Sequence, residues 1–169
     1  MDYGNALLRR LREEQDKGIY ADPRQKLYYV SHQEGEFQFQ VRFQEVEKVG
    51  IVLDYISIAK EPPIQDVEEI NRRLDEQADA VQKRITFLLE DFKLIEMDSQ
   101  NKRAQLRSYP PYKEEDSRYY YEIVLDEGTR VHFQRYQYSS KQRRYEKVTS
   151  QMTVESFTRL INELTDILK

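Results

Sequence analysis

Residues 36–44 read EFQFQVRFQ, with apolar and polar side chains in strict alternation after the first residue. The apolar side chains are Phe37, Phe39, Val41 and Phe43, and the polar ones that follow them are Gln38, Gln40, Arg42 and Gln44. Successive side chains of a strand point to opposite faces, so this period of two predicts a half-buried antiparallel strand. We expect its phenylalanine face to meet the core and its glutamine face to meet solvent.

Two further strands should flank this one. Gly35 suits a hairpin turn back to a strand that opens with Tyr28 and Tyr29. After a polar turn at 45–48, a third strand is expected over 49–59, and the side chains that should share its core face are Val49, Ile51, Leu53 and Tyr55. The first half of the chain therefore predicts three antiparallel strands.

A short helix is predicted before these strands, over residues 3–17. Asp2 suits the N-cap, and Gly18 suits the position just beyond the last turn. The apolar side chains on one face of this helix are Leu7, Leu8 and Leu11. We expect this narrow stripe to pack on the body of the protein or on a partner.

A much longer helix is predicted after the third strand. Pro62 and Pro63 should end the strand and open the helix, because proline is tolerated in a first helical turn. The apolar stripe that follows reaches about Asp98 and consists of Val67, Ile70, Leu74, Ala78, Val81, Ile85, Leu88, Phe92 and Ile95. Its spacing of about 3.67 residues fits a straight helix on a sheet better than a coiled coil.

A helix of roughly thirty residues would be about 45 Å long, which exceeds the length of a typical strand. We therefore expect it to cross from the first set of strands to a second set. The alternatives are a break near Glu90 and Asp91, or an overhang that meets a partner chain.

The second half repeats the succession of strands and a helix. Strands are predicted over 104–108, 118–125, 129–138 and 143–149, with a loop over 109–117. Asp126, Glu127 and Gly128 suit a type I turn followed by a bulge. Thr153 should cap a last helix, and the apolar face of that helix consists of Val154, Phe157, Leu160, Ile161, Leu164 and Leu168.

The fold class predicted from these elements is α+β, with antiparallel sheet and helices packed on one face, in a single domain over 1–169. Two repeated halves, 27–98 and 103–169, joined by the long helix, are a further hypothesis. Tyrosines, glycines and helices of the two halves align only at different offsets. The repeat therefore stays open.

Composition limits the classes of function. The 169 residues carry a net charge of −4 and contain 13 Tyr and 7 Phe but no Cys, which excludes disulfides, thiolate zinc sites and cysteine nucleophiles. No apolar run approaches the ~18 residues of a membrane span, so we expect a cytoplasmic protein that does not enter a membrane. Residues 103–148 hold ten Lys and Arg against seven Asp and Glu, a local charge of +3 that is too weak for a dedicated duplex-binding domain.

The hairpin of the second half carries the candidate site. If Tyr121, Ile123, Val131 and Phe133 face the core, alternation places another set of side chains on the opposite face. With two arginines that follow the hairpin, the predicted binding residues are Tyr120, Arg130, His132, Gln134, Tyr136, Tyr138, Arg143 and Arg144. Tyr and Arg are enriched at interaction hot spots. The competing interpretation is that a helix covers each face of this sheet and that the tyrosines belong to the core.

The leading functional prediction is a non-enzymatic, adaptor-like domain that binds a protein, or a second copy of itself, through this face or through helix surfaces. The alternative is a small-ligand or single-stranded nucleic-acid binding protein that uses the same face. Nucleic acid is the weaker option, because the strand lacks the glycine-rich aromatic signature of an RNA-binding sheet and the chain is acidic.

No catalytic, cofactor or metal motif is found. The chain has no phosphate-cradling glycine loop and no nucleophile elbow. The two histidines, His32 and His132, are not at metal-ligand spacing. Carboxylate groups such as Glu45 with Glu47 flank a predicted turn, so nothing indicates the burial that acid–base chemistry needs. We therefore expect no enzyme activity, no cofactor and no metal.

Overall fold

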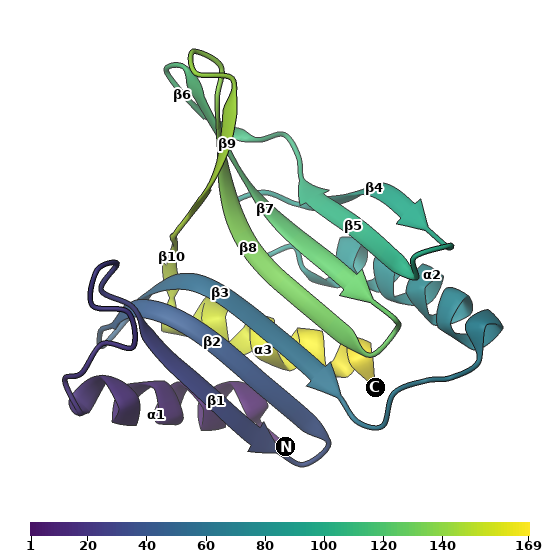
Figure 1. Ribbon diagram of the computed structural model, residues 1–169, viewed down its shortest axis with the longest axis horizontal. Coiled ribbons are helices and arrows are strands. Elements are labelled where there is room, and N and C mark those ends of the chain that lie inside the picture. Colours follow the sequence, from purple (N-terminus) through teal and green to yellow (C-terminus); the bar gives the residue numbers. More distant parts are fainter.

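One antiparallel sheet organises the chain, and the computed structural model describes all of residues 1–169 (Figure 1). The three helices are α1 (Tyr3–Asp16), α2 (Val67–Arg84) and α3 (Val154–Leu168). The ten strands are β1 (Tyr28–Glu34), β2 (Phe37–Val46), β3 (Gly50–Lys60), β4 (Phe92–Asp98), β5 (Arg103–Ser108), β6 (Tyr112–Glu114), β7 (Ser117–Asp126), β8 (Arg130–Ser139), β9 (Arg144–Val148) and β10 (Ser150–Thr153). The α+β prediction is confirmed.

The sheet runs in the order β1-β2-β3-β8-β7-β5-β4, and β10, β6 and β9 pair with β3, β7 and β8 respectively. The strands of the two halves join where β3 pairs with β8, with Ile56 opposite Phe133. After β3 the chain crosses through α2 to the far edge of the sheet, and the later strands return toward β3. The number of strands differs between the halves, and an internal repeat is not confirmed.

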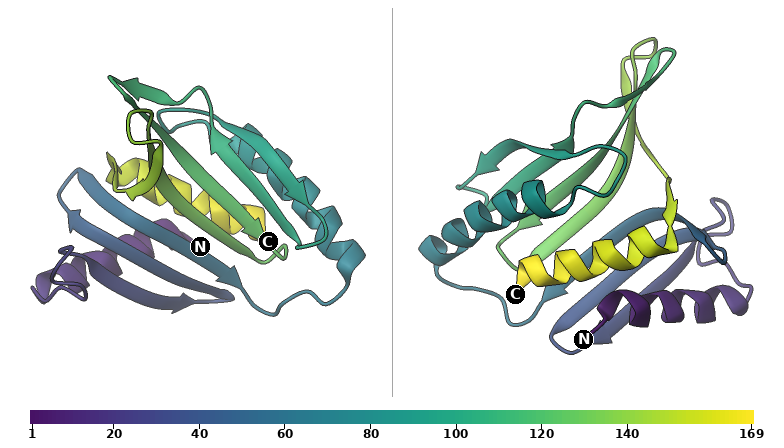
Figure 2. Two further views of the ribbon diagram at one scale, coloured as in Figure 1. Left: turned by 45° about the horizontal axis from the view of Figure 1, so that its top comes forward. Right: turned by 180° about the vertical axis from the view of Figure 1, so that it is seen from behind.

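All three helices lie against the same face of the sheet, as the view from behind shows (Figure 2). The alternation at residues 36–44 is confirmed, since Phe37, Phe39, Val41 and Phe43 are fully buried on the helix side. No helix covers the opposite face, which we call the open face (Figure 1). The interpretation in which each face carries a helix is therefore wrong.

The first and last helices begin and end as expected. The Asp2 carboxylate accepts a hydrogen bond from the Asn5 amide at 3.0 Å, and Gly18 beyond α1 has a φ of +71°. The Leu7, Leu8 and Leu11 stripe is buried. At α3 the hydroxyl of Thr153 accepts from the Ser156 amide at 3.0 Å, so both predicted N-caps are confirmed.

The prediction of a roughly thirty-residue helix is wrong. The observed α2 has 18 residues; it begins after Asp66 and ends at Arg84. Phe92 and Ile95 belong to β4, which pairs with β5. Of the stripe residues beyond Arg84, Ile85 and Phe92 are still buried, whereas Ile95 is 51% exposed. Tertiary pairing with β5 favours the extended conformation there.

The predicted core face of the third strand is also wrong beyond Leu53. Arg42 pairs with Tyr55 but Phe43 pairs with Leu53, so Asp54 is an extra residue in β3. Such a bulge shifts the alternation by one position. Ile56 and Ile58 consequently face the core in β3, while Tyr55 turns to the open face. Val49 lies just before β3 and is exposed.

The β7–β8 turn and the region around it differ from the prediction too. Both Glu127 and Gly128 have positive φ, at 58° and 74°, whereas a type I turn with a bulge needs only one such residue. The segment predicted as a loop over 109–117 contains β6, which folds back onto β7. Together with β9 and the ends of β7 and β8, it forms a projecting arm (Figure 1).

No helix of the structure is both long enough and apolar enough to cross a membrane.

Candidate functional site

The open face presents the predicted side chains of β7 and β8. Tyr121 and Phe133 are buried on the helix side of these strands. The alternate side chains therefore point to the open face, as the prediction required, and they are Tyr120, Glu122, Arg130, His132, Gln134, Tyr136 and Tyr138. Their local placement follows from alternation alone. Their environments differ, and only tertiary contacts decide those.

Tyrosine rings form a continuous group across β7, β8 and β9. Tyr120 stacks on Tyr136 with ring centroids 5.8 Å apart, and Tyr138 lies 4.6 Å from Tyr145. Tyr120 also meets Tyr145 edge to face at 6.4 Å. The Tyr136 hydroxyl donates to Oε1 of Gln134 at 2.6 Å. The rings therefore hold one another in place.

Tyr120 is buried beneath the other rings of this group and is only 5% exposed, so it supports them rather than meeting a partner directly. The Arg107 guanidinium lies 4.4 Å from the centre of its ring. Burial is the main cause that raises the pKa of the Tyr120 hydroxyl to about 12, although the Arg107 charge acts in the opposite direction. Tyr120 remains protonated at neutral pH.

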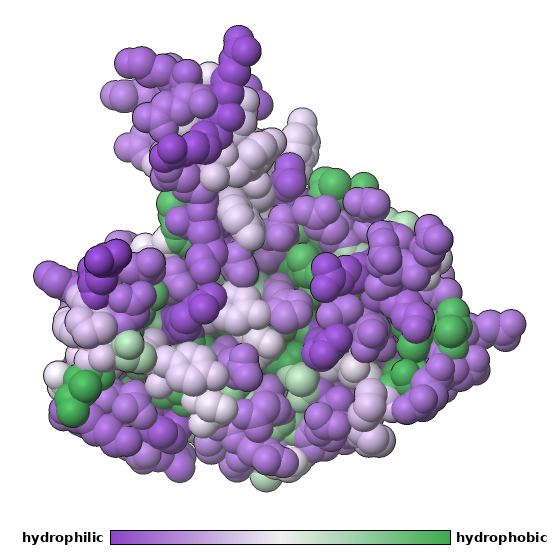
Figure 3. Space-filling view, in the orientation of Figure 1, coloured by the Kyte–Doolittle hydropathy of each residue, from purple (hydrophilic) through white to green (hydrophobic).

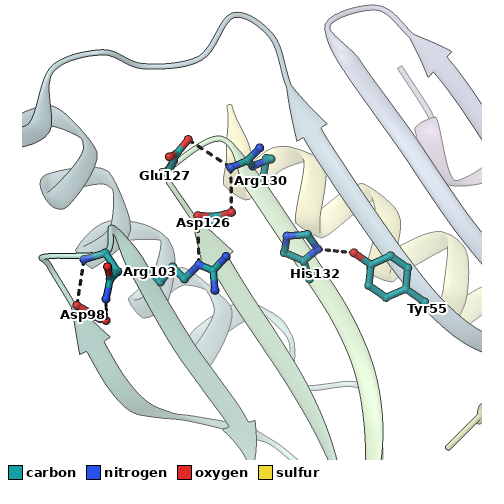
Figure 4. A network of polar contacts seen from close by, with 8 residues as sticks. Tyr55, Asp98, Arg103, Asp126, Glu127, Arg130 and His132 are labelled. Atoms are coloured by element: carbon teal, nitrogen blue, oxygen red, sulfur yellow. Dashed lines mark hydrogen bonds and ion pairs between the residues drawn. The ribbon is translucent and has the colours of Figure 1, made fainter. Parts of the chain in front are cut away.

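His132 is joined to Tyr55 across the β3–β8 seam. The Tyr55 hydroxyl and Nδ1 of His132 are 2.5 Å apart and hydrogen bonded (Figure 4). Burial lowers the pKa of the imidazole, partly offset by the charge of Asp126. The β3 bulge puts Tyr55 here, and sequence reasoning missed it because it assigned Tyr55 to the core.

Tyr55 is in turn bracketed by charged residues. The Arg42 guanidinium lies 4.6 Å from the centre of the Tyr55 ring. Asp54 accepts ion pairs from Arg42 at 3.2 Å and from Lys147 at 3.6 Å. The open face thus continues from the second half of the chain onto β2 and β3.

Arg130 is at the opposite end of β8 from the tyrosines. Its guanidinium is 3.0 Å from Asp126 and 3.3 Å from Glu127, and Arg103 also reaches Asp126 at 3.5 Å (Figure 4). These ion pairs brace the β7–β8 turn. The structure therefore does not bring Arg130 together with Tyr136 and Tyr138.

Arg143 and Arg144 lie at the tip of the arm, where β8 turns into β9 (Figure 1). Both are exposed, and Arg144 pairs with Glu146. Arg144 stands opposite Ser139 and directly precedes Tyr145 in β9, so the two side chains alternate to opposite faces of the strand. Both arginines lie at the far end of the ladder from His132, so the structure does not bring them together with it.

A hollow of about 410 Å³ opens at the base of the arm, and we call it the arm hollow. Its lining residues are Arg107, Ser108, Tyr109, Pro110, Pro111, Lys113, Arg118, Tyr120, Tyr138 and Tyr145. Sequence reasoning missed Arg107, Lys113 and Arg118 as site residues. The Tyr-Pro-Pro-Tyr signal marked the break in the chain after β5, but nothing in it indicated that β6 begins at Tyr112 and pairs with β7.

The chemistry of the face is that of recognition by aromatic rings, hydrogen bonds and ion pairs. Nowhere do three or more His, Asp or Glu side chains gather in a group that could hold a metal ion. Comparison of the chain with protein-family models, with curated proteins and with solved structures found no match. The function is therefore argued from the side chains themselves.

Proposed function

We propose that this chain is a non-enzymatic interaction domain that binds a protein partner through its open face. The observation that carries the proposal is the pre-ordered tyrosine group on a sheet face that no helix covers. Its members support one another by stacking between Tyr120 and Tyr136 and between Tyr138 and Tyr145. Tyrosine combines a large contact area with a polar hydroxyl, which suits it to interfaces.

The side chains of the open face are already ordered in the free protein, which lowers the entropy cost of binding a partner. A side chain that is immobilised only on association costs about 0.5–1.5 kcal/mol of conformational entropy. Tyr136 is already fixed by its ring contact and by its bond to Gln134, and His132 is fixed by Tyr55. A partner that meets these rings therefore loses little of its binding free energy to ordering them.

The polarity of the open face favours a reversible complex over a permanent one. In the space-filling view this face is mainly hydrophilic, with pale side chains near its middle and only scattered hydrophobic ones (Figure 3). Interfaces that form and dissociate are about as polar as ordinary protein surface, whereas permanent ones are more apolar. We therefore expect a reversible complex, with a second copy of this chain as one candidate partner.

The polar groups of the face do not form a catalytic arrangement. The His132 ring is bonded to a tyrosine hydroxyl, and no carboxylate hydrogen bonds to it. The carboxylates of Asp126 and Asp54 are engaged by arginines or lysine. Binding, rather than acid–base chemistry, is the role these contacts support.

The proposal is tested with two alanine truncations, Tyr136→Ala on the open face and Arg72→Ala on the solvent side of α2. Proteins captured by the immobilised wild-type chain are purified and titrated calorimetrically against each variant. We expect Tyr136→Ala to weaken binding at least about tenfold, as truncation of an interface anchor does. Arg72→Ala should bind as the wild type does, because Arg72 contacts only Glu76 one turn away.

The reverse result, with affinity lost in Arg72→Ala and kept in Tyr136→Ala, would assign binding to the helix side and overturn the proposal. Size-exclusion chromatography with light scattering tells whether the partner is a second copy. In that case Tyr136→Ala should shift the mass toward that of the monomer.

A further inference from the structure

The arm hollow collects positive charge without any carboxylate among its lining residues. Arg107, Lys113 and Arg118 all line it, and none of them forms an ion pair or a side-chain hydrogen bond. Elsewhere on the open face Arg42, Arg130 and Lys147 are all paired with aspartates. Cations without an ion pair occur elsewhere, as at Lys141 and Arg143, but here three of them line one hollow in a chain whose net charge is −4.

Arg107 is the best positioned of the three cations. Its guanidinium lies over the Tyr120 ring, and its Nε is buried with no hydrogen-bond partner. The nearest strand neighbour with negative charge is Glu122, opposite Arg107 in the β5–β7 ladder. Glu122 already accepts a hydrogen bond from Gln105 at 2.8 Å. Arg107 thus retains unused donor capacity beside an aromatic wall.

The remaining walls are aromatic and proline-rich. Tyr109 is 63% exposed and Tyr145 is 58% exposed, so both offer free ring surface. Tyr138 packs against Tyr145 within the arm, with ring centroids 4.6 Å apart. Pro110 and Pro111 add rigid apolar surface. The hollow therefore combines anion-binding donors with a place for a flat or apolar side chain.

We infer that the arm hollow binds an anionic segment of a protein partner. Carboxylate or phosphoryl oxygens of the segment accept hydrogen bonds from Arg107, Lys113 and Arg118, and a neighbouring aromatic side chain packs on Tyr138 and Tyr145. The inference rests on the proposed function, since it specifies what part of the partner reaches the open face. The volume of about 410 Å³ accommodates a few side chains.

Charge complementarity favours a short acidic peptide over a nucleic-acid strand. Glu114 ends β6, Glu115 and Asp116 form the turn to β7 in the same arm, and these carboxylates would repel a long chain of phosphates. A peptide places its negative charge only where the cations are. Arginine clusters recognise acidic and phosphorylated peptides in this way.

The test uses fluorescence anisotropy with synthetic labelled peptides. The probes are Glu-Glu-Tyr-Glu-Glu, its uncharged analogue Gln-Gln-Tyr-Gln-Gln, the acidic peptide with phosphotyrosine, and a short oligothymidylate. We expect the acidic peptide to bind at least about tenfold more tightly than the glutamine peptide, and this preference should shrink as salt screens the charges. The phosphotyrosine peptide shows whether carboxylates or a phosphoryl group are preferred.

Two matched charge reversals locate the site. Lys113→Glu with Arg118→Glu changes exposed residues of the hollow, whereas Arg24→Glu with Lys48→Glu makes the same change in charge at exposed residues outside it. We expect the first pair to abolish the preference for the acidic peptides and the second pair to keep most of it. Circular dichroism checks that both variants are folded.

Equal binding of the acidic and glutamine peptides, or binding of neither the acidic nor the phosphotyrosine peptide, would overturn the inference. Equal effects of the two charge reversals, or tighter binding of oligothymidylate than of any peptide, would do the same. The proposed function is tested separately: it is overturned if Tyr136→Ala binds the partner as tightly as the wild type does. If partner binding depends on Tyr136 but the acidic peptide binds no more tightly than the glutamine peptide, the proposed function stands. Only the inference about the arm hollow is then overturned.

Discussion

The guanidinium Nη1 of Arg135 lies 3.2 Å from Oε1 of Glu90, and the two side chains are only 8% and 7% exposed. The same carboxylate oxygen accepts from the Ser108 hydroxyl at 3.1 Å, and that hydroxyl accepts from the Tyr121 amide at 2.7 Å. Arg135 also lies 4.2 Å from the centre of the Tyr121 ring. This buried network ties the connection after α2 to the strands that carry the arm.

Arg135→Met should destabilise the protein by about 3–5 kcal/mol, because it leaves the Glu90 charge buried without a partner. Adding Glu90→Leu removes that charge and should recover most of the lost free energy of unfolding. Urea unfolding of both variants gives the free energies. Arg130→Met is the control, with an expected cost of about 1 kcal/mol or less for its more exposed pair. A double variant as unstable as Arg135→Met would contradict this account.

Gly4→Ala should destabilise the contact between α1 and α3 by about 1–3 kcal/mol, the usual cost of overpacking. A Cβ at this position would meet the Thr158 carbonyl oxygen at 2.2 Å, and backbone cannot move aside as a flexible side chain can. At an open helix position the same substitution is stabilising. Thermal unfolding compares it with Arg9→Ala, an exposed change in the same helix that should shift stability by less than about 0.5 kcal/mol. An unchanged or raised melting temperature would count against the close approach.

Stability should fall as the pH drops below about 6.5, in part because of His132. Burial depresses the pKa of His132 in the folded protein below its ordinary value of 6.5. The unfolded chain therefore binds the proton more readily than the folded protein does. The stability that neutral His132 contributes is present above pH 6.5 and is lost as the pH falls toward the folded pKa. We expect His132→Gln to show a shallower loss between neutral and mildly acidic pH. A nuclear magnetic resonance titration that gives His132 a pKa of 6.5 or higher would refute this prediction.

Tyr120 should make the protein less stable as the pH rises, the opposite direction to that of His132. Its pKa of about 12 lies above the ordinary value of 10.0, so the folded state keeps a proton that the unfolded chain releases. The resulting stability is present below pH 10.0 and is lost as the pH rises toward 12. Tyr120→Phe should therefore unfold at a higher pH than the wild type in an alkaline titration followed by circular dichroism. Coincident alkaline transitions would show that Tyr120 does not contribute.

The strongest sequence predictions concern local periodicity and helix caps. Alternation at residues 36–44 indicated which face of β2 is buried, and the same rule placed His132, Gln134 and Tyr136 on the open face. Asp2 and Thr153 marked the starts of two helices. These features depend on residues a few positions apart, so they can be read along the chain.

The failures come from interactions between distant segments. The apolar spacing beyond Arg84 fits a helix, but β5 offers strand pairing and ends it. The bulge at Asp54 is set by pairing with β2, and it turns Tyr55 toward His132. No periodic pattern signals either event.

The amino-acid sequence by itself determined the fold class, the buried faces of β2, β7 and β8 and the N-caps of α1 and α3, because backbone geometry makes side-chain direction a function of local spacing. Only the tertiary structure ruled out a helix on each face of the sheet, and only it brought Tyr55 to His132. It also decided that Arg107, Lys113 and Arg118 surround one hollow. Those relationships depend on which strands pair and where the ladder is bulged, and long-range pairing is settled by the packing of the whole chain.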